Sequence, residues 1–148
     1  MPQLSLHTPL GDLTVSEEDG AIVAVDWGWG RDQDETPLLL LAREQLQEYF
    51  DGVRVAFELP LQPQGTAYRR RVWAALCEIP PGATRTYADI ARVAGGSARS
   101  VGQANGANPI PVLIPCHRVI ASAGLGGYSG GDGLDTKRFL LQLEARAV

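Results

Sequence analysis

The chain has 148 residues, of which 45% are hydrophobic and 20% charged, a composition typical of a soluble globular protein with one domain or two small lobes. No apolar run approaches the roughly 18 residues of a membrane span, and the N-terminus has no signal-peptide pattern. Two cysteines are too few for a secreted disulfide framework, and no Cys or His pair has a zinc-like spacing. We therefore expect reduced thiols, a cytoplasmic location, no membrane association and no metal site.

The net charge of −4 is unevenly distributed along the chain. Residues 1–66 carry a net charge of −9, residues 67–118 carry +5, and residues 119–148 are neutral. Every basic residue of the middle block is arginine, whose forked guanidinium suits phosphate contacts. This asymmetry suggests a basic face that binds an anionic polymer and an acidic lobe that lies away from it, although clustered arginines are most often only a solvated face.

The first third of the chain predicts strands followed by one helix. Alternating apolar residues indicate strands at Leu4–Thr8, Leu13–Val15 and Ala21–Trp27, separated by turn residues. Pro37 is typical of a first helical position and predicts a helix that runs to about Phe50. Val53–Leu59 predicts a further strand. A Pro- and Gly-containing linker follows, so we expect an N-terminal lobe at residues 1–62 and a C-terminal lobe at residues 63–148.

The second lobe predicts mostly helices. Thr66 is a candidate N-cap for a helix over Ala67–Ile79, in which we expect Cys77 to be a buried core residue. Two short helices follow at Tyr87–Ala94 and Ala98–Asn105, separated by two glycines. This pattern predicts a helix-turn-helix, although an ordinary helical hairpin has the same pattern.

The remaining segments complete an α+β prediction. Ile110–Ile114 is apolar and strand-like, and the segment from Gly124 to Gly133 holds six glycines that predict a loop. A last helix is expected from Asp135 to about Ala145. The fold class is therefore α+β, with a small antiparallel sheet and a flanking helix, then a helical helix-turn-helix lobe that carries a reactive cysteine.

Cys116 is the candidate nucleophile because His117 follows it directly, although a buried structural thiol beside a surface histidine has the same dipeptide and is the commoner case. A thiol becomes a strong nucleophile as thiolate, which a nearby base promotes. Neighbouring side chains of an extended segment point to opposite sides, so this pair requires a bridging water or a local turn. Glu144 on the last helix is the candidate carboxylate that orients the imidazole.

The segment Ile114-Pro115-Cys116-His117-Arg118-Val119-Ile120 resembles the active-site signature of the O6-alkylguanine-DNA alkyltransferases, or methylated-DNA–protein-cysteine methyltransferases. Other parts of that family's pattern occur in order: Arg71-Val72-Trp73, Ile79-Pro80-Pro81-Gly82, Thr86-Tyr87, Ile90-Ala91, Arg99 with Val101-Gly102, Asn108-Pro109, Gly127-Tyr128-Ser129-Gly130-Gly131, and Lys137, Leu140-Leu141 and Glu144. The resemblance is strong from Gly65 to Glu144 and weaker over residues 1–64.

The resemblance implies a self-alkylating repair protein. Cys116 would take the alkyl group irreversibly from O6-methylguanine in DNA, with O4-methylthymine as a further substrate. His117 would act as base through a water, Glu144 would orient it, and Asn108 would shape the turn before the cysteine. Tyr87 would contact the phosphate beside the lesion and help to protonate the leaving guanine. The resemblance implies no cofactor, double-stranded DNA as partner and a monomeric protein.

The DNA-contacting residues follow from the same resemblance. Arg99 would enter the base stack in place of the flipped nucleotide. Gly102 and Ala104 are small and would let their helix approach the sugar backbone closely. Three further residues would line the pocket and meet the base or its alkyl group: Pro111, Tyr128 and Ser129.

Three alternatives are compatible with parts of the pattern. Alkyltransferase-like proteins resemble the same fold and bind lesions without repair, but they typically have Trp where this chain has Cys116. In a helix-turn-helix regulator, the Cys-His pair would have no catalytic role. A Cys-His hydrolase would need its nucleophile at a helix N-terminus beside an oxyanion hole, which the strand-like Val112–Ile114 does not suggest.

Overall fold

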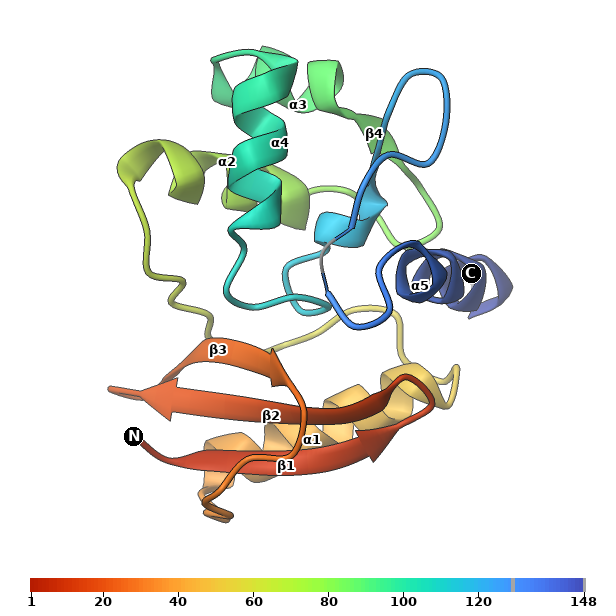
Figure 1. Cartoon of the computed structure of the whole chain (residues 1–148). Coiled ribbons are helices and arrows are strands. Elements are labelled where there is room, and N and C mark those ends of the chain that lie inside the picture. Colours follow the sequence, from red (N-terminus) through yellow and green to blue (C-terminus); the bar gives the residue numbers. More distant parts are fainter. Residues whose placement is uncertain (129, 148) are drawn as a thin grey trace.

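The computed structural model describes residues 1–128 and 130–147 and confirms the predicted α+β fold (Figure 1). An antiparallel sheet of order β1-β2-β3 forms the N-terminal part. Its strands are β1 (Gln3–Thr8), β2 (Gly11–Glu18) and β3 (Ala21–Trp27). The predicted strands are confirmed, with β2 longer at both ends than the alternating apolar residues indicated.

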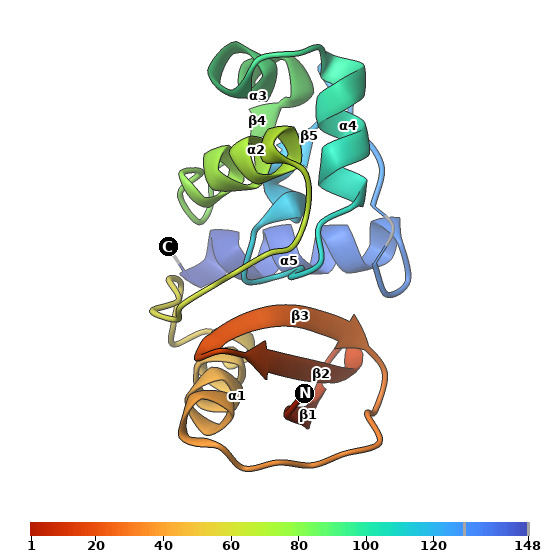
Figure 2. The ribbon, with the colours of Figure 1, turned by 90° about the vertical axis from the view of Figure 1, so that its left-hand side faces the viewer.

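Helix α1 (Pro37–Phe50) has the bounds that the sequence predicted. The Thr36 side chain accepts a hydrogen bond from the backbone N–H of Leu39, and Pro37 opens the first turn, where a missing N–H costs nothing. The helix contacts β1 and β2, and its buried side chains contribute to the hydrophobic core. Figure 2 shows α1 beside the sheet, with the C-terminal helices beyond β3.

The predicted strand at Val53–Leu59 is wrong. This segment is irregular, and the buried Gln45 side chain of α1 holds it by bonding both the N–H and the C=O of Glu58. Phe57 and Leu59 are partly buried against the core without pairing along a sheet, whereas Val53 is 75% exposed. Strand-like hydrophobicity does not distinguish these two ways of burying a segment.

Three helices form the predicted helix-turn-helix region: α2 (Ala67–Cys77), α3 (Tyr87–Ala94) and α4 (Ala98–Gly106). Thr86 and Ser97 cap α3 and α4, and each makes a reciprocal bond with the side chain three residues later. Helix α2 ends two residues before the predicted Ile79, because the chain turns there toward Pro80. All three helices contact one another.

The C-terminal segments pack against these helices. Short parallel strands β4 (Arg85–Thr86) and β5 (Val119–Ile120) pair with each other, a pairing too short to predict from sequence. The 3-10 helix η1 (Cys116–Arg118) precedes β5, and α5 (Leu134–Ala147) closes the chain.

Two contacts join the N-terminal sheet region to the helical part. The backbone N–H of Val25 in β3 donates to the carbonyl of Pro109 at 2.9 Å, and Tyr49 of α1 donates to Glu144 of α5 at 2.6 Å. Buried side chains from both parts form one continuous core. Across residues 1–128 and 130–147, no helix combines the length and apolar character that crossing a bilayer requires.

Candidate active site

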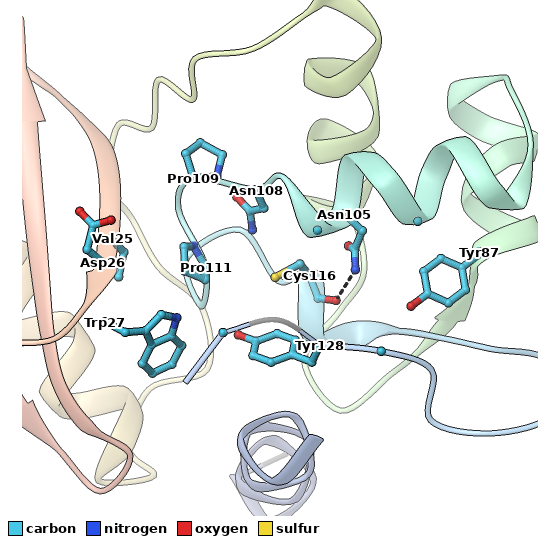
Figure 3. Close-up of a pocket in the computed structure, with 14 residues that line it drawn as sticks. Val25, Asp26, Trp27, Tyr87, Asn105, Asn108, Pro109, Pro111, Cys116 and Tyr128 are labelled. Carbon is cyan, nitrogen blue, oxygen red and sulfur yellow. Dashed lines mark hydrogen bonds between the residues drawn. The ribbon is translucent and has the colours of Figure 1, made fainter. Parts of the chain in front are cut away.

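Cys116 lies in a pocket of about 520 Å³ between β3, α4 and the glycine-rich loop (Figure 3). The thiol-bearing residue is only 5% exposed, so a substrate atom must enter the pocket to reach it. The pocket residues come from both parts of the molecule: Val25, Asp26, Trp27, Tyr87, Gly102, Asn105, Gly106, Asn108, Pro109, Pro111, Cys116, Gly127, Tyr128 and Gly130.

The chain before Cys116 is a turn, so the expectation of a strand-like approach is wrong. Val112 has a φ of 71°, a left-handed conformation that a strand does not contain and that β-branched residues rarely adopt. The Asn108 side chain stabilises this turn by accepting from the N–H of Ile110 at 2.9 Å and donating to the carbonyl of Ile114 at 3.0 Å. The turn delivers Cys116 to the first position of η1.

His117 is fully buried behind Cys116 and contacts Glu144. Its Nε2 lies 2.7 Å from Glu144 Oε2, and the Arg118 guanidinium donates to both oxygens of the same carboxylate at 2.8 Å. Because the carboxylate only accepts, Nε2 carries the proton and His117 Nδ1 keeps its lone pair. Nδ1 is buried with no hydrogen-bonding partner among the described residues.

The ionisation of this cluster suits a neutral imidazole beside a carboxylate. Burial alone would raise the pKa of Glu144, but hydrogen bonds from His117, Arg118 and Tyr49 lower that pKa to about 2. Burial lowers the pKa of His117 from its ordinary value, although Glu144 opposes this shift. At neutral pH, the imidazole is therefore unprotonated at Nδ1 and able to accept a proton.

Burial is also the main influence on the pKa of the Cys116 thiol. It raises the pKa of the thiol, while polar groups of Asn108 and Tyr128 and the charge of Lys137 oppose the shift. Burial lowers the pKa of Lys137 to about 8, and its ammonium donates to the carbonyls of Val119 at 2.6 Å and Gly127 at 3.0 Å. The thiol is thus protonated at rest, and a base is needed to form the thiolate.

Tyr87 forms the rim of the pocket next to α4. A side chain at Gly102 would lie 3.9 Å from the Tyr87 ring, and one at Gly126 would lie 2.9 Å from the Tyr87 hydroxyl. Gly126 also has a φ of 74°, which L side chains rarely adopt. A Cβ at Gly102 would make only an ordinary van der Waals contact, so Gly126 is the glycine that leaves space for the Tyr87 hydroxyl.

Two family models match the chain over nearly its whole length. The "6-O-methylguanine DNA methyltransferase, DNA binding domain" matches residues 67–146, and the "6-O-methylguanine DNA methyltransferase, ribonuclease-like domain" matches residues 4–63. The chain belongs to the 6-O-methylguanine DNA methyltransferase family.

Individual relatives of this family match most of the chain. The constitutive methylated-DNA–protein-cysteine methyltransferase of Bacillus subtilis is 44% identical over 152 residues, which cover 93% of this chain and 92% of the relative. The methylated-DNA–protein-cysteine methyltransferase of Mycolicibacterium paratuberculosis is 52% identical over 156 residues, covering 96% and 91%. The crystal structure of Mycobacterium tuberculosis OGT in complex with DNA superposes with a TM-score of 0.88 at 37% identity, covering 99% of this chain and 94% of that chain.

The site residues inferred from the family resemblance fall into two groups. Asn108, Pro111 and Tyr128 line the pocket with Cys116, as do Tyr87 and Gly102. His117 and Glu144 lie behind the pocket and do not line it. Arg99 is exposed on α4 and lies outside the pocket, and Ser129 lies outside the described residues.

Two expectations, one from the family pattern and one from the charge distribution, are corrected. Ala104 is 1% exposed and faces the core, where its carbonyl accepts from the indole of Trp73 at 2.8 Å, so its side chain cannot meet a sugar backbone. Arg118 was counted in the basic block, but it is buried and bonded to Glu144. The other arginines of that block are exposed: Arg69, Arg70, Arg71, Arg85, Arg92 and Arg99.

The prediction that Cys77 is a buried core residue is also wrong. Cys77 is the last residue of α2, and its side chain is exposed. The helical pattern predicted that Cys77 lies on the buried face of α2 beside Leu76, but at this end of the helix its side chain is on the exposed side. Desolvation and the neighbouring Glu78 raise the pKa of its thiol.

Several site residues were missed at the sequence level. Asn105 lines the pocket, and its side chain donates to the Cys116 carbonyl at 3.2 Å. Asp26 and Trp27 of β3 form the far wall, and Tyr49 reaches Glu144 from α1. No local pattern marks these contacts, because the Asn105 contact depends on how α4 packs against η1 and the others depend on how the sheet region packs against the helices. Among residues 1–128 and 130–147, no cluster of three or more His, Cys, Asp or Glu side chains is placed to hold a metal ion.

Proposed function

We propose that this protein repairs DNA by moving the alkyl group from O6 of guanine in double-stranded DNA to its own Cys116. The observation that carries the proposal is a thiol inside a pocket with a neutral imidazole and an ionised carboxylate directly behind it. Membership of the family, and the names of relatives that cover nearly the whole chain, support the same activity.

The proposed reaction begins with proton removal from the thiol. The Cys116 proton passes through a water to Nδ1 of His117, and Glu144 stabilises the imidazolium that forms. The thiolate then attacks the alkyl carbon, so that an S–C bond forms as the C–O6 bond breaks. Tyr87 helps to protonate the departing guanine from the pocket rim. The product is a thioether, which no group in the site can hydrolyse, so one chain repairs one lesion without a cofactor.

We propose that α3 and α4 present the DNA-binding surface. The exposed arginines of residues 67–118 supply positive charge for phosphates, and Arg99 extends from the first turn of α4. O6 is buried in stacked DNA, so the base must leave the stack at a cost of a few kcal/mol. Arg99 fills the space that the base leaves, and Gly102 lets α4 approach the sugar backbone closely. Pro111, Tyr128 and Ser129 surround the base.

We further propose that residues 1–62 form a supporting lobe and residues 63–148 the DNA-binding and catalytic lobe. The acidic charge of the first lobe keeps that surface away from DNA. Both cysteines are free thiols, which fits a reducing cytoplasm. We propose that the protein acts there as a monomer.

Intact-mass and peptide-mapping measurements after mixing with one equivalent of O6-methylguanine duplex test the proposal. The expected result is the mass of one methyl group, located on Cys116. Cys77→Ser should react like the wild type, whereas Cys116→Ser should bind the lesion duplex without accepting the group. Repeated turnover by one chain, or methylation of Cys77, would contradict the mechanism.

A further inference from the structure

Tyr49 connects the N-terminal part of the molecule to the proton relay. It lies on α1, is 1% exposed, and is separated from Glu144 by 95 residues of sequence. Its hydroxyl nevertheless lies 2.6 Å from Glu144 Oε2. The residues that flank Cys116 in sequence give no indication of this contact.

The Glu144 carboxylate is fully occupied by donors. Oε2 accepts from Tyr49 at 2.6 Å, from His117 Nε2 at 2.7 Å and from Arg118 Nη2 at 2.8 Å, and Oε1 accepts from Arg118 Nε at 2.8 Å. Arg118 is itself anchored, because its Nη1 donates to the carbonyl of Ile79 at 2.7 Å. Tyr49 and His117 therefore share a single oxygen atom whose position sets the direction of the imidazole.

The position of the Tyr49 hydroxyl is set by its own surroundings. The Tyr49 ring packs edge-on against Phe50 with a centroid distance of 5.3 Å and at a tilt against Phe57 at 5.1 Å. Burial and the Glu144 charge raise the pKa of Tyr49, so the hydroxyl remains a donor over the whole working range of pH. A rigid neutral donor thus reaches the carboxylate from outside the catalytic segment.

We propose that Tyr49 is a positioning residue for alkyl transfer that acts through Glu144, because its hydroxyl bonds the oxygen that faces His117 and moderates the charge that this oxygen presents to the imidazole. The proposal rests on the proposed function, since it assigns Tyr49 to the same proton relay. It also gives the N-terminal part of the chain a direct share in the chemistry, beyond support of the fold.

The sign of the expected effect follows from the shared oxygen. A donor on Oε2 neutralises part of the carboxylate charge, and this reduces the stabilisation that Glu144 gives to a protonated His117. Loss of the hydroxyl leaves Oε2 more negative, so His117 takes up a proton at higher pH. The other charged groups that act on His117 are unchanged by this substitution: Arg118 and Lys137.

The test is the pH dependence of single-turnover transfer from free O6-benzylguanine to wild type and Tyr49→Phe. The free base needs no DNA binding, so the rate reports the pocket and relay. His117 must be neutral to accept the thiol proton, so the acid limb of the profile should move to higher pH by about half to one unit in the variant. An acid limb that coincides with the wild type would overturn the proposal.

Gln45→Met is the matched control. Gln45 lies one turn before Tyr49 on the buried face of α1 and bonds Glu58, without touching the relay. Gln45→Met should lower the midpoint of thermal unfolding but leave the acid limb of the pH profile in place. An equal shift of the acid limb in this control would mean that Tyr49 has only a structural role. Imidazole ¹⁵N chemical shifts of unreacted protein follow His117 without any transfer. They should show protonation at higher pH in Tyr49→Phe, and they separate failure of this proposal from failure of the proposed function.

Discussion

Cys116 has His117 beside it and polar groups of Asn108 and Tyr128 close to its thiol, whereas Cys77 is exposed at the end of α2 next to Glu78. Both thiols have raised pKa values, and for both the main cause is desolvation. The difference is that Cys116 has groups that offset this cost and a base behind it. At the residue scale, reactivity therefore depends on the neighbours that the fold supplies.

Glu144→Gln should slow transfer at least about tenfold, because a neutral amide stabilises the His117 imidazolium less than a carboxylate. Binding to an unreacted lesion duplex should stay close to wild type, since Glu144 is buried away from the surface. Single-turnover rates and equilibrium binding measure the two effects separately. Glu48→Gln removes a half-exposed carboxylate paired with Arg54 and should leave both unchanged. A normal rate in Glu144→Gln would remove this residue from the relay.

At the scale of elements, the helices were predicted best because their ends have local causes. The bounds of α1 and α3 match the predictions, and the start of α4 does too, since Thr36, Thr86 and Ser97 each bond a backbone N–H of the first turn. Local chemistry does not determine which face of an end residue is covered. That is why Cys77 was expected to be buried, whereas the expectation for Ala104 came from the family resemblance and not from a local pattern.

The segments around the site were predicted less well. The run before Cys116 is as apolar as a strand, but Val112 adopts a left-handed conformation that the Asn108 bonds stabilise. The contact of Tyr49 with Glu144, and the wall of the pocket that Trp27 forms, depend on how distant segments pack together. The sequence therefore predicted a candidate reactive group and its nearest partners, but it could not show the part that the sheet region plays.

Gly126→Ala tests how the glycine-rich loop places Tyr87. A Cβ at Gly126 would lie 2.9 Å from the Tyr87 hydroxyl and 3.2 Å from the backbone nitrogen of Ala121, at a φ of 74°. The strain should cost about 1 kcal/mol in the free energy of unfolding, and the displaced Tyr87 should slow transfer from duplex DNA. Gly124→Ala is the control, because nothing lies within 4 Å of its Cβ position. Equal behaviour of the two variants in both denaturant unfolding and transfer would contradict this role.

Arg99→Ala tests how α4 acts on DNA in the proposed function. If Arg99 replaces the flipped base, its loss should slow transfer from well-paired duplex far more than transfer from single strands or free O6-benzylguanine, which need no extrusion. If it contacts only phosphate, binding to all DNA should weaken about equally and the salt slope should fall by roughly one unit. Gln103→Ala, one turn further along α4 and also exposed, controls for the helix surface. Equal slowing on duplex and free base would reject the base-replacing role.

At the scale of the whole molecule, the buried Glu144 cluster, which the proposed mechanism uses as its proton relay, also links the two parts of the fold. Tyr49 reaches it from α1, Arg118 and His117 from η1, and Glu144 itself from α5. Breaking a buried pair by removing one partner commonly costs about 3–5 kcal/mol, because the remaining charge loses its compensation. The ionisation of this cluster should therefore be visible in the stability of the entire chain.

The free energy of unfolding should fall as the pH is lowered, in two steps. The pKa of Glu144 is lowered from 4.5 to about 2 in the folded protein, so between these values the unfolded chain binds the proton more readily. The stabilisation from this group is fully present above about pH 4.5 and is lost as the pH falls through about 2. The shift corresponds to about 3 kcal/mol. The lowered pKa of His117 acts in the same direction below its ordinary value of 6.5.

Denaturant unfolding of wild type, Glu144→Gln and Glu48→Gln between pH 7 and pH 3 measures this dependence. Glu144→Gln should be less stable at pH 7 but lose little more stability below pH 4.5, because it has no carboxylate to protonate at this position. Its curve should therefore approach that of the wild type at low pH. Glu48→Gln should follow the slope of the wild type throughout, since its carboxylate is half-exposed and pairs only at the surface. Parallel curves for wild type and Glu144→Gln would mean that the cluster does not couple protonation to folding.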